Sequence, residues 1–283
     1  MKFKYFGTAA AECWPGLFCS CENCKKAIKA GGRNIRSRSQ ALVNDDLLID
    51  LPPDTYYHII KDGLDLTKTR HIIITHSHDD HFYAPDLHRT YPPFAYNEKK
   101  EKISQLNIYG NEAVNIHAKD FENYQDILIF HEIHAFEKYN IGKYIVTPLK
   151  ADHDYSQNCL IYIIEDITDS VRSKSKILYA NDTGYFPDET WDYLQKNHSG
   201  NKKFDFVSLD TTNGMIESRI GHMGVDGCGD VKKRLIGMGA ADNNAVFCYN
   251  HFSHNGGKIY DELVPIAGQA GFLVSYDGME LDI

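Results

Sequence analysis

The sequence predicts an α/β protein in which helices flank two mixed β-sheets. Short apolar runs of strand length, bounded by turn residues, recur along the chain and alternate with segments of helical pattern. Several of these runs end in histidine or aspartate, where a rigid scaffold can aim a reactive side chain. At 283 residues the chain is long for one core, yet two-sheet sandwiches reach this size. We therefore expect a single domain over residues 1–283.

The first half of the chain contains the early strands and two helices. Residues 2–7 alternate like an edge strand, and residues 41–50 form two strands joined by a turn at 44–45. Pro53 lies near the start of a helix at 53–62, because proline suits a first helical turn. The other elements expected in this half are strands at 71–74 and 106–109 and a helix at 111–120.

The second half continues the alternation of strands and helices. Segments 127–136 and 143–149 are expected to form one strand pair. A second pair, 158–165 and 176–180, is separated by the polar segment from Asp166 to Ser175, which has the composition of a solvent loop. The remaining predicted elements are strands at 204–209, 245–249 and 271–275 and helices at 187–197, 225–238 and 258–269.

A heptad rich in histidine and aspartate follows the apolar strand at 71–74. Residues 75–81 read Thr-His-Ser-His-Asp-Asp-His. His76 and His78, two residues apart, can face one metal ion, and Asp80 and His81 can face a second. Imidazole nitrogen and carboxylate oxygen suit zinc or manganese and commonly leave one coordination position open for water. Bunching so many ionisable groups without a cation is costly, so the heptad predicts a metal site.

Three further candidate ligands each follow a short apolar run. His153 comes after residues 144–149, Asp182 after 177–180 and His251 after 245–249. Taken singly, each is equally well explained as a surface or capping residue. Taken as an ordered set after the heptad, they predict the rest of a binuclear metal site.

This order, HxHxDH followed by His, Asp and His, resembles the metallo-β-lactamase-fold hydrolases over essentially the whole chain. The resemblance implies an αβ/βα sandwich with two divalent metals, zinc or manganese, in the active site. The ligands that it implies are His76, His78 and His153 for one metal, Asp80, His81 and His251 for the other, and Asp182 as the bridge.

A cysteine cluster near the N-terminus narrows the resemblance. Cys19, Cys21 and Cys24 form a C-x-C-x-x-C pattern, a soft ligand set for zinc that lacks one ligand. His254 lies three residues after His251. The pattern resembles the PhnP-type cyclic phosphodiesterases, and this implies a structural zinc held by the three cysteines and His254. The alternative is inert or disulfide-forming cysteines, but disulfides need an oxidising compartment and no export signal is evident.

His222 precedes the helix expected at 225–238. In the PhnP-like enzymes a histidine in this position points into the active site without binding metal. The free N–H groups of a helix N-terminus also suit contact with a phosphate oxygen. The alternative is a capping or buried histidine.

The net charge of −9 argues against a broad nucleic-acid surface, because polyanion binding relies on Lys and Arg neutralising phosphates. The first residues lack the apolar core of a signal peptide, and no apolar run approaches a membrane span. We expect a cytoplasmic protein that does not associate with membranes. Arg33, Arg36 and Arg38 are expected to solvate a loop, with phosphate contact as the alternative.

Two segments depart from the compact PhnP pattern and have the character of insertions: Tyr91 to Lys102, rich in aromatic residues, and Asp166 to Ser175. A loop of this kind beside the metals would act as a lid or shape substrate choice. The aromatic residues would instead serve a homodimer contact if they lie away from the site.

The expected reaction is hydrolysis of a cyclic or small phosphodiester, such as phosphoribosyl 1,2-cyclic phosphate, to a monoester. Two cations about 3.5–4 Å apart would activate a hydroxide and neutralise phosphoryl charge. Asp80 and Asp182 would orient the nucleophile, and His222 would protonate the departing sugar oxygen. The alternatives are a lactam, acyl or thioester hydrolase, a tRNA-processing nuclease, and a non-hydrolytic protein resembling PqqB.

Overall fold

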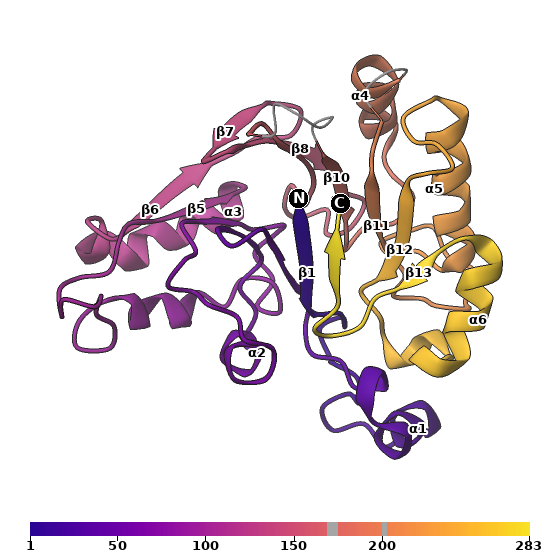
Figure 1. Ribbon diagram of the computed structural model, residues 1–283, viewed down its shortest axis with the longest axis horizontal. Helices are drawn as coiled ribbons and strands as arrows, with labels where there is room; N and C mark the ends of the chain where they lie inside the picture. The colour runs from indigo at the N-terminus through magenta and orange to yellow at the C-terminus, as the bar shows by residue number, and fades with distance from the viewer. Residues whose placement is uncertain (169–174, 200–202) are drawn as a thin grey trace.

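Two seven-stranded sheets face each other, with helices on their outer surfaces (Figure 1). The computed structural model describes residues 1–168, 175–199 and 203–283. The two chain ends meet, and the Met1 amino group donates a 2.7 Å hydrogen bond to the Ile283 carbonyl oxygen. This architecture confirms the predicted α/β class with two mixed, helix-flanked sheets.

The first sheet places the end of the heptad-bearing strand beside a second strand end. Strands β3 to β6 run parallel, so their carboxyl ends share one edge. In spatial order the strands of this sheet are β14 (Glu280–Asp282), β1 (Lys2–Gly7), β2 (Gln40–Val43), β3 (Leu47–Ile49), β4 (His71–Ile73), β5 (Leu106–Gly110) and β6 (Leu128–Glu132).

The second sheet brings four more strand ends together. Strands β10 to β13 are parallel, and β8 runs in the same direction as β10 because both pair antiparallel with β9. In spatial order the strands are β13 (Leu273–Val274), β12 (Val246–Asn250), β11 (Phe206–Asp210), β10 (Lys176–Ala180), β9 (Leu160–Asp166), β8 (Tyr144–Lys150) and β7 (Tyr139–Ile141).

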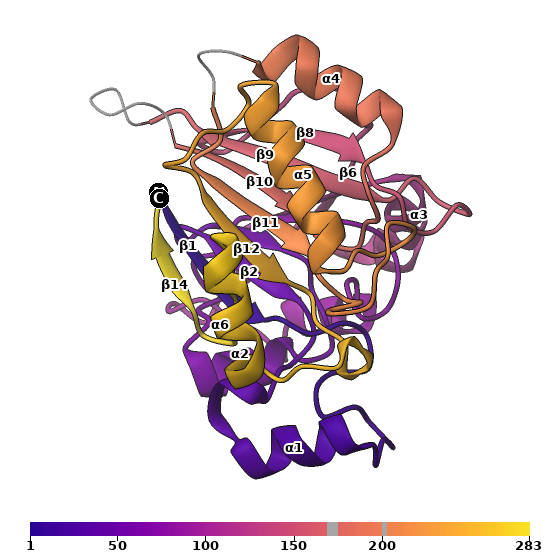
Figure 2. The same ribbon diagram turned by 90° about the vertical axis from the view of Figure 1, so that its right-hand side faces the viewer.

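Helices α4, α5 and α6 cover the outer face of the second sheet, whereas α2, α3 and the neighbouring 3₁₀ segments lie against the first (Figure 2). None of the helices in the described part of the chain has the length and apolar character that a membrane crossing needs. The helices are α1 (Glu22–Ala30), α2 (Thr55–Asp62), α3 (Glu112–Asn115), α4 (Asp188–His198), α5 (Val225–Gly237) and α6 (Tyr260–Ala270), with 3₁₀ segments η1 (Gly32–Asn34), η2 (Ala84–Thr90), η3 (Ile116–Tyr124) and η4 (His254–Gly256).

Strand β10 illustrates why the central strands are apolar on both faces. Ile177 and Tyr179 point into the core between the sheets, whereas Leu178 and Ala180 point toward the helices. All four side chains are buried. A strand covered on both faces has a nearly continuous apolar run, which is the pattern that the sequence shows here.

Several predicted elements need correction. Strand β1 is not an edge strand, because β14 pairs with its outer side. Segments 127–136 and 143–149 are not a pair: β6 belongs to the first sheet and β8 to the second. The pairing of β9 with β10 confirms the other predicted pair. The expected helix at 111–120 is a short α-helix followed by a 3₁₀ segment. Of the loop expected from Asp166 to Ser175, residues 169–174 lie outside the described residues.

The arginine prediction is also wrong for Arg36, which is buried rather than solvating a loop. Its Nη1 donates to Thr8 Oγ1 and to the Ser275 carbonyl oxygen, each at 2.7 Å. The guanidinium lies 4.0 Å from the centre of the Phe252 ring. Arg36 therefore ties the segment after β1 to the segment after β12.

A buried histidine in α2 links this region to the end of β3. His58 is hydrogen-bonded to Ser37 Oγ at 2.7 Å and to Gln40 Oε1 at 2.6 Å. Gln40 Nε2 in turn donates to the Asp50 carbonyl oxygen at 3.0 Å. Burial lowers the pKa of His58 to about 4. His58 is thus a neutral, buried hydrogen-bonding element between α2 and the end of β3.

His58 should make the protein acid-sensitive between pH 6.5 and 4. In this window the unfolded chain binds a proton that the folded protein excludes, so stability falls as the pH falls. The shift corresponds to about 3 kcal/mol lost by pH 4. Urea unfolding of the wild type and His58→Gln at pH 7.5, 5.5 and 4.5 measures it. The glutamine variant should lose less stability over this range, and parallel losses in the two proteins would contradict the assignment.

Candidate metal centre

The heptad and the end of β8 bring three imidazoles together. Ligand atoms of His76, His78 and His153 lie within 4.8 Å of one another. His76 Nε2 is 2.9 Å from His78 Nδ1, and the His76 and His153 ring centres are 5.0 Å apart. These are the three residues expected to hold the first metal.

A second set forms directly beside the first. Ligand atoms of Asp80, His81, Asp182 and His251 also lie within 4.8 Å of one another, and all four residues are buried. Asp182 Oδ2 lies 2.5 Å from His81 Nε2 and 3.7 Å from His76 Nε2. Asp182 thus contacts members of both sets, in the position expected of a bridging ligand.

Two of the imidazole nitrogens are placed as metal ligands rather than as hydrogen-bonding partners. Within the described part of the chain, the buried Nε2 atoms of His81 and His251 have no hydrogen bond of good geometry, although carboxylate oxygens of Asp182 and Asp80 lie 2.5 and 3.2 Å from His81 Nε2. Buried polar atoms that converge without hydrogen bonds suit a shared cation. The residues therefore fit divalent metals.

Burial and the neighbouring charges shift the pKa of these groups in opposite directions. Burial lowers the pKa of His76 and of His153. Burial acts against ionisation of Asp182, but His251 and His81 outweigh it and hold its pKa well below the usual range. His81 differs, because Asp182, Asp80 and Asp50 outweigh burial and raise its pKa well above the usual range. Neutral His76 and His153 and the ionised Asp182 carboxylate are the forms that bind a cation.

Carboxylates that the sequence reasoning missed support the ligands. Asp50, at the end of β3, is fully buried, and its Oδ2 lies 2.7 Å from His81 Nδ1. Its Oδ1 accepts from the Thr75 backbone N–H at 2.8 Å. Asp154 Oδ2 lies 3.1 Å from His78 Nε2. A carboxylate on the far ring nitrogen fixes the orientation of a ligating histidine.

Three residues of the centre adopt a left-handed backbone conformation: Asp50 (φ 65°), Asp182 (φ 48°) and His251 (φ 61°). Asp50 and His251 directly follow β3 and β12, and Asp182 lies two residues beyond the end of β10, so each is placed where the chain leaves a strand. This conformation is uncommon for residues other than glycine and clusters at functional sites.

His222 enters the same pocket from the loop before α5. Its Nδ1 donates to Asp210 Oδ2 at 2.8 Å, and Asp210 Oδ1 accepts from the Thr212 backbone N–H at 2.9 Å. Burial alone would lower the pKa of His222, but Asp210 outweighs it and raises the value to about 9. Asp210 was also missed, although it ends strand β11 as Asp182 follows β10. Asp210 and His222 form a further possible ligand set with Asp182 and His251.

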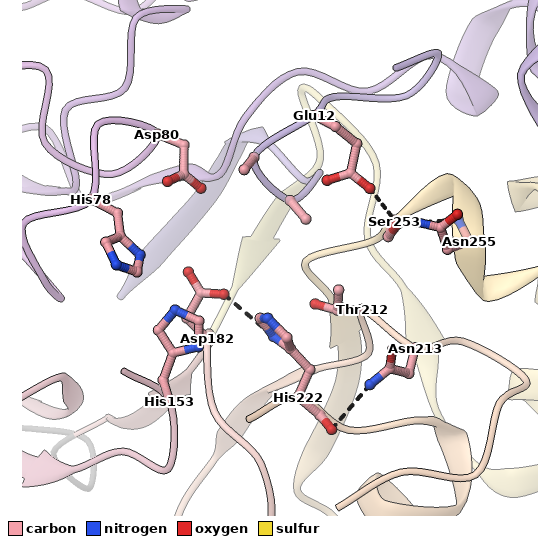
Figure 3. Close-up of a pocket in the computed structure, with 12 residues that line it drawn as sticks. Glu12, His78, Asp80, His153, Asp182, Thr212, Asn213, His222, Ser253 and Asn255 are labelled. Carbon is pink, nitrogen blue, oxygen red and sulfur yellow. Dashed lines mark hydrogen bonds and ion pairs between the residues drawn. The ribbon is translucent and has the colours of Figure 1, made fainter. Parts of the chain in front are cut away.

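A cavity of about 300 Å³ opens onto the metal centre. Figure 3 shows His78, Asp80, His153 and Asp182 on one side and Glu12 on the other, with His222 between them. Among the described residues, none from Tyr91 to Lys102 lines this cavity. The expectation of a lid in that segment is therefore not supported, and Phe94 and Tyr96 are exposed to solvent.

The cysteine cluster also assembles with the fourth residue expected for it. Ligand atoms of Cys19, Cys21, Cys24 and His254 lie within 4.8 Å of one another. His254 Nδ1 is 3.5 Å from Cys21 Sγ and 3.9 Å from Cys19 Sγ. The Cys24 backbone N–H lowers the pKa of Cys21 to about 6. Three thiols and one imidazole at these separations suit a closed tetrahedral zinc site.

Comparison with solved structures identifies similar folds at low sequence identity. The chain is similar to a diphosphatase from the PhnP family, with a TM-score of 0.71 and 19% identity over 99% of this chain and 97% of the other. For zinc-bound PqqB from Methylobacterium extorquens the values are 0.70 and 17%, over 100% of both chains. For the short form of human tRNase Z they are 0.66 and 17%, over 100% of this chain and 99% of the other. Identities this low establish the fold alone.

A search of curated protein sequences gave no significant match. The model of the β-lactamase superfamily domain, in contrast, matches residues 48–238. This range includes the heptad, His153, Asp182 and His222 and spans more than half of the chain. The two facing sheets and the metal-ligand geometry at their shared edge agree with that match, and the protein belongs to the β-lactamase superfamily with the metallo-β-lactamase fold.

Proposed function

We propose that this protein is a metal-dependent hydrolase of cyclic or small phosphodiesters, acting as a single domain over residues 1–283. The observation that carries the proposal is the pair of ligand sets that meet at Asp182, with His222 in the same cavity. When bound, two divalent cations, zinc or manganese, would supply charge stabilisation for phosphoryl oxygens and a water of lowered pKa.

The cavity favours a diester over a monoester. Among the described residues that line it, none is lysine or arginine. Charge neutralisation therefore depends on the metal cations and on the His222 imidazolium, and a diester has less negative charge than a monoester. The carboxylates of Asp80 and Asp182 would hold the attacking water in line with phosphorus while serving as ligands.

His222 is placed to donate a proton to the leaving group. Asp210 accepts from its Nδ1, so the ring is held in one orientation and Nε2 is left for the cavity. A positioned imidazolium can protonate the departing oxygen as the bond to phosphorus breaks. Asp210 acts here as a positioning residue.

The cysteine cluster is proposed to hold a structural zinc. His254 lies three residues after His251, so a metal at the cluster would restrain the loop that carries His251. A closed site of four protein ligands contributes folding energy rather than chemistry.

The reaction class can be tested with chromogenic substrates on the metal-reconstituted protein. Bis-p-nitrophenyl phosphate should turn over well and p-nitrophenyl phosphate poorly, because no lysine or arginine among the described lining residues can balance the monoester's extra charge. Nitrocefin and a thioester serve as acyl controls. Comparable monoesterase activity, or faster hydrolysis of nitrocefin, would contradict the proposal.

The role of His222 can be tested through leaving-group dependence. A ribose alkoxide leaves badly and needs a proton, whereas p-nitrophenolate leaves well without one. His222→Ala should therefore lower turnover of a cyclic ribose phosphate by about 10²–10⁴-fold and that of bis-p-nitrophenyl phosphate much less. His131→Ala, a histidine that stacks on Tyr109, is the control. Equal losses on both substrates would assign His222 to phosphoryl binding, and lost metal would make it a ligand.

Elemental analysis should find about three metals per chain, as the ligand counts of the two kinds of site require. Cys21→Ser should lose close to one zinc and lower the melting temperature. Cys13→Ser, which changes a thiol outside the cluster, should keep all metals. Full metal content in Cys21→Ser would rule out the structural zinc.

A further inference from the structure

We propose that the cavity wall opposite the metal ligands is a binding subsite for a neutral, hydroxyl-bearing group, such as a sugar ring, and that Glu12 is its main hydrogen-bond acceptor. This inference rests on the proposed function, because it describes the alcohol portion of the same phosphodiester. It predicts that a second phosphate on that portion weakens binding.

Glu12 faces the metal centre across the cavity (Figure 3). Its Oε1 accepts a short hydrogen bond from Ser253 Oγ and lies 3.8 Å from His254 Nε2. Its Oε2 has no partner among the described residues, and the side chain is 31% exposed. A partly buried carboxylate thus presents one free oxygen to whatever occupies the cavity.

Two amides in the same cavity lining add further hydrogen-bonding capacity. Asn213 Nδ2 donates to the His222 carbonyl oxygen at 3.2 Å, and no described residue bonds to its Oδ1. The side-chain amide of Asn255 likewise has no partner among the described residues, although its backbone N–H donates to Ser253 Oγ at 3.1 Å. One carboxylate and two amides can meet several hydroxyl groups at once.

The composition of the cavity lining argues against a second phosphate group and against a nucleobase in this subsite. Within the described residues, the lining contains no lysine or arginine that would bind a second phosphate, and the Glu12 carboxylate would repel one. It also contains no Phe, Tyr or Trp on which a nucleobase would stack. The volume of about 300 Å³ lies at the small end for ligand sites. A compact, neutral polyol satisfies all of these limits.

The loop that carries Glu12 is held firmly. The Ala10 backbone N–H donates to the Phe252 carbonyl oxygen at 3.0 Å, and the Leu17 N–H donates to the Glu12 carbonyl oxygen at 3.1 Å. Phe252 directly follows His251, so Glu12 is tied to the loop of a proposed metal ligand. A subsite held in this way loses little entropy when it binds its ligand.

The test compares three substrates on the metal-loaded protein: ribose 1,2-cyclic phosphate, its 5-phosphorylated counterpart and bis-p-nitrophenyl phosphate. The wild type should prefer the first of the two cyclic compounds. Glu12→Ala should lower kcat/KM for ribose 1,2-cyclic phosphate by about 10- to 100-fold, the size expected for a hydrogen bond to a charged group. Turnover of bis-p-nitrophenyl phosphate, which lacks hydroxyls, should stay within about 2-fold, with metal content unchanged. Glu12→Gln, which removes the charge but keeps an acceptor, should narrow the preference between the cyclic compounds.

Glu280→Gln is the matched control, because Glu280 is exposed on β14 and pairs with Lys4. Equal losses on all three substrates in Glu12→Ala, or a wild-type preference for the 5-phosphorylated compound, would overturn the subsite. Failure of the proposed function is distinguishable, since the wild type would then hydrolyse no diester at all. Saturation-transfer NMR with D-ribose reads the subsite without turnover: a signal that Glu12→Ala abolishes supports it, and an unchanged signal refutes it.

Discussion

The buried carboxylate of Asp182 is the constraint on which the rest of the structure depends. It follows β10 in the second sheet, yet its Oδ2 reaches His76 and His81, which follow β4 in the first sheet. The carboxyl-terminal edges of the two sheets must therefore lie close enough for these side chains to contact one another. An ionised carboxylate in this position is costly unless positive charge balances it. The free energy of metal binding is consequently linked to the packing of the sheets.

Polar contacts between the sheets maintain this alignment. The Tyr162 hydroxyl on β9 donates to the Ile74 carbonyl oxygen at 2.5 Å, and the Leu160 N–H donates to the Thr75 carbonyl oxygen at 2.9 Å. Both bonds cross from the second sheet to the segment where β4 leads into the heptad. Tyr5, on the other sheet, donates to Ser208 Oγ at 2.7 Å. Apolar packing alone would tolerate small slips, whereas these buried hydrogen bonds fix one register.

The sequence predicted the features whose signals are local. A histidine or aspartate shortly after an apolar run marked His153, Asp182 and His251, and the structure brings them to the heptad. The same signal preceded Asp50 and Asp210, but their roles depend on contacts with residues far along the chain, which spacing cannot reveal. For the same reason the strand pattern at 127–136 was detected and then given to the wrong sheet. Periodicity indicates that a segment is a strand and which of its side chains share a face. It does not indicate which other strand pairs with that segment.

Glu12 is the extreme case of such a long-range contact, since its partner Ser253 lies 241 positions away. The link also explains why the cysteine cluster bears on the cavity. His254 turns Nδ1 toward the thiols and Nε2 toward Glu12, so one imidazole lies between the proposed structural metal and the proposed subsite. Whatever restrains His254 therefore restrains the His251 loop and the Glu12 carboxylate together. The proposed structural metal and the proposed subsite then share the loop after β12 with His251, whereas the other residues of the metal centre follow other strands. Substrate choice can thus diverge through residues 8–24 while the chemistry at Asp182 stays the same.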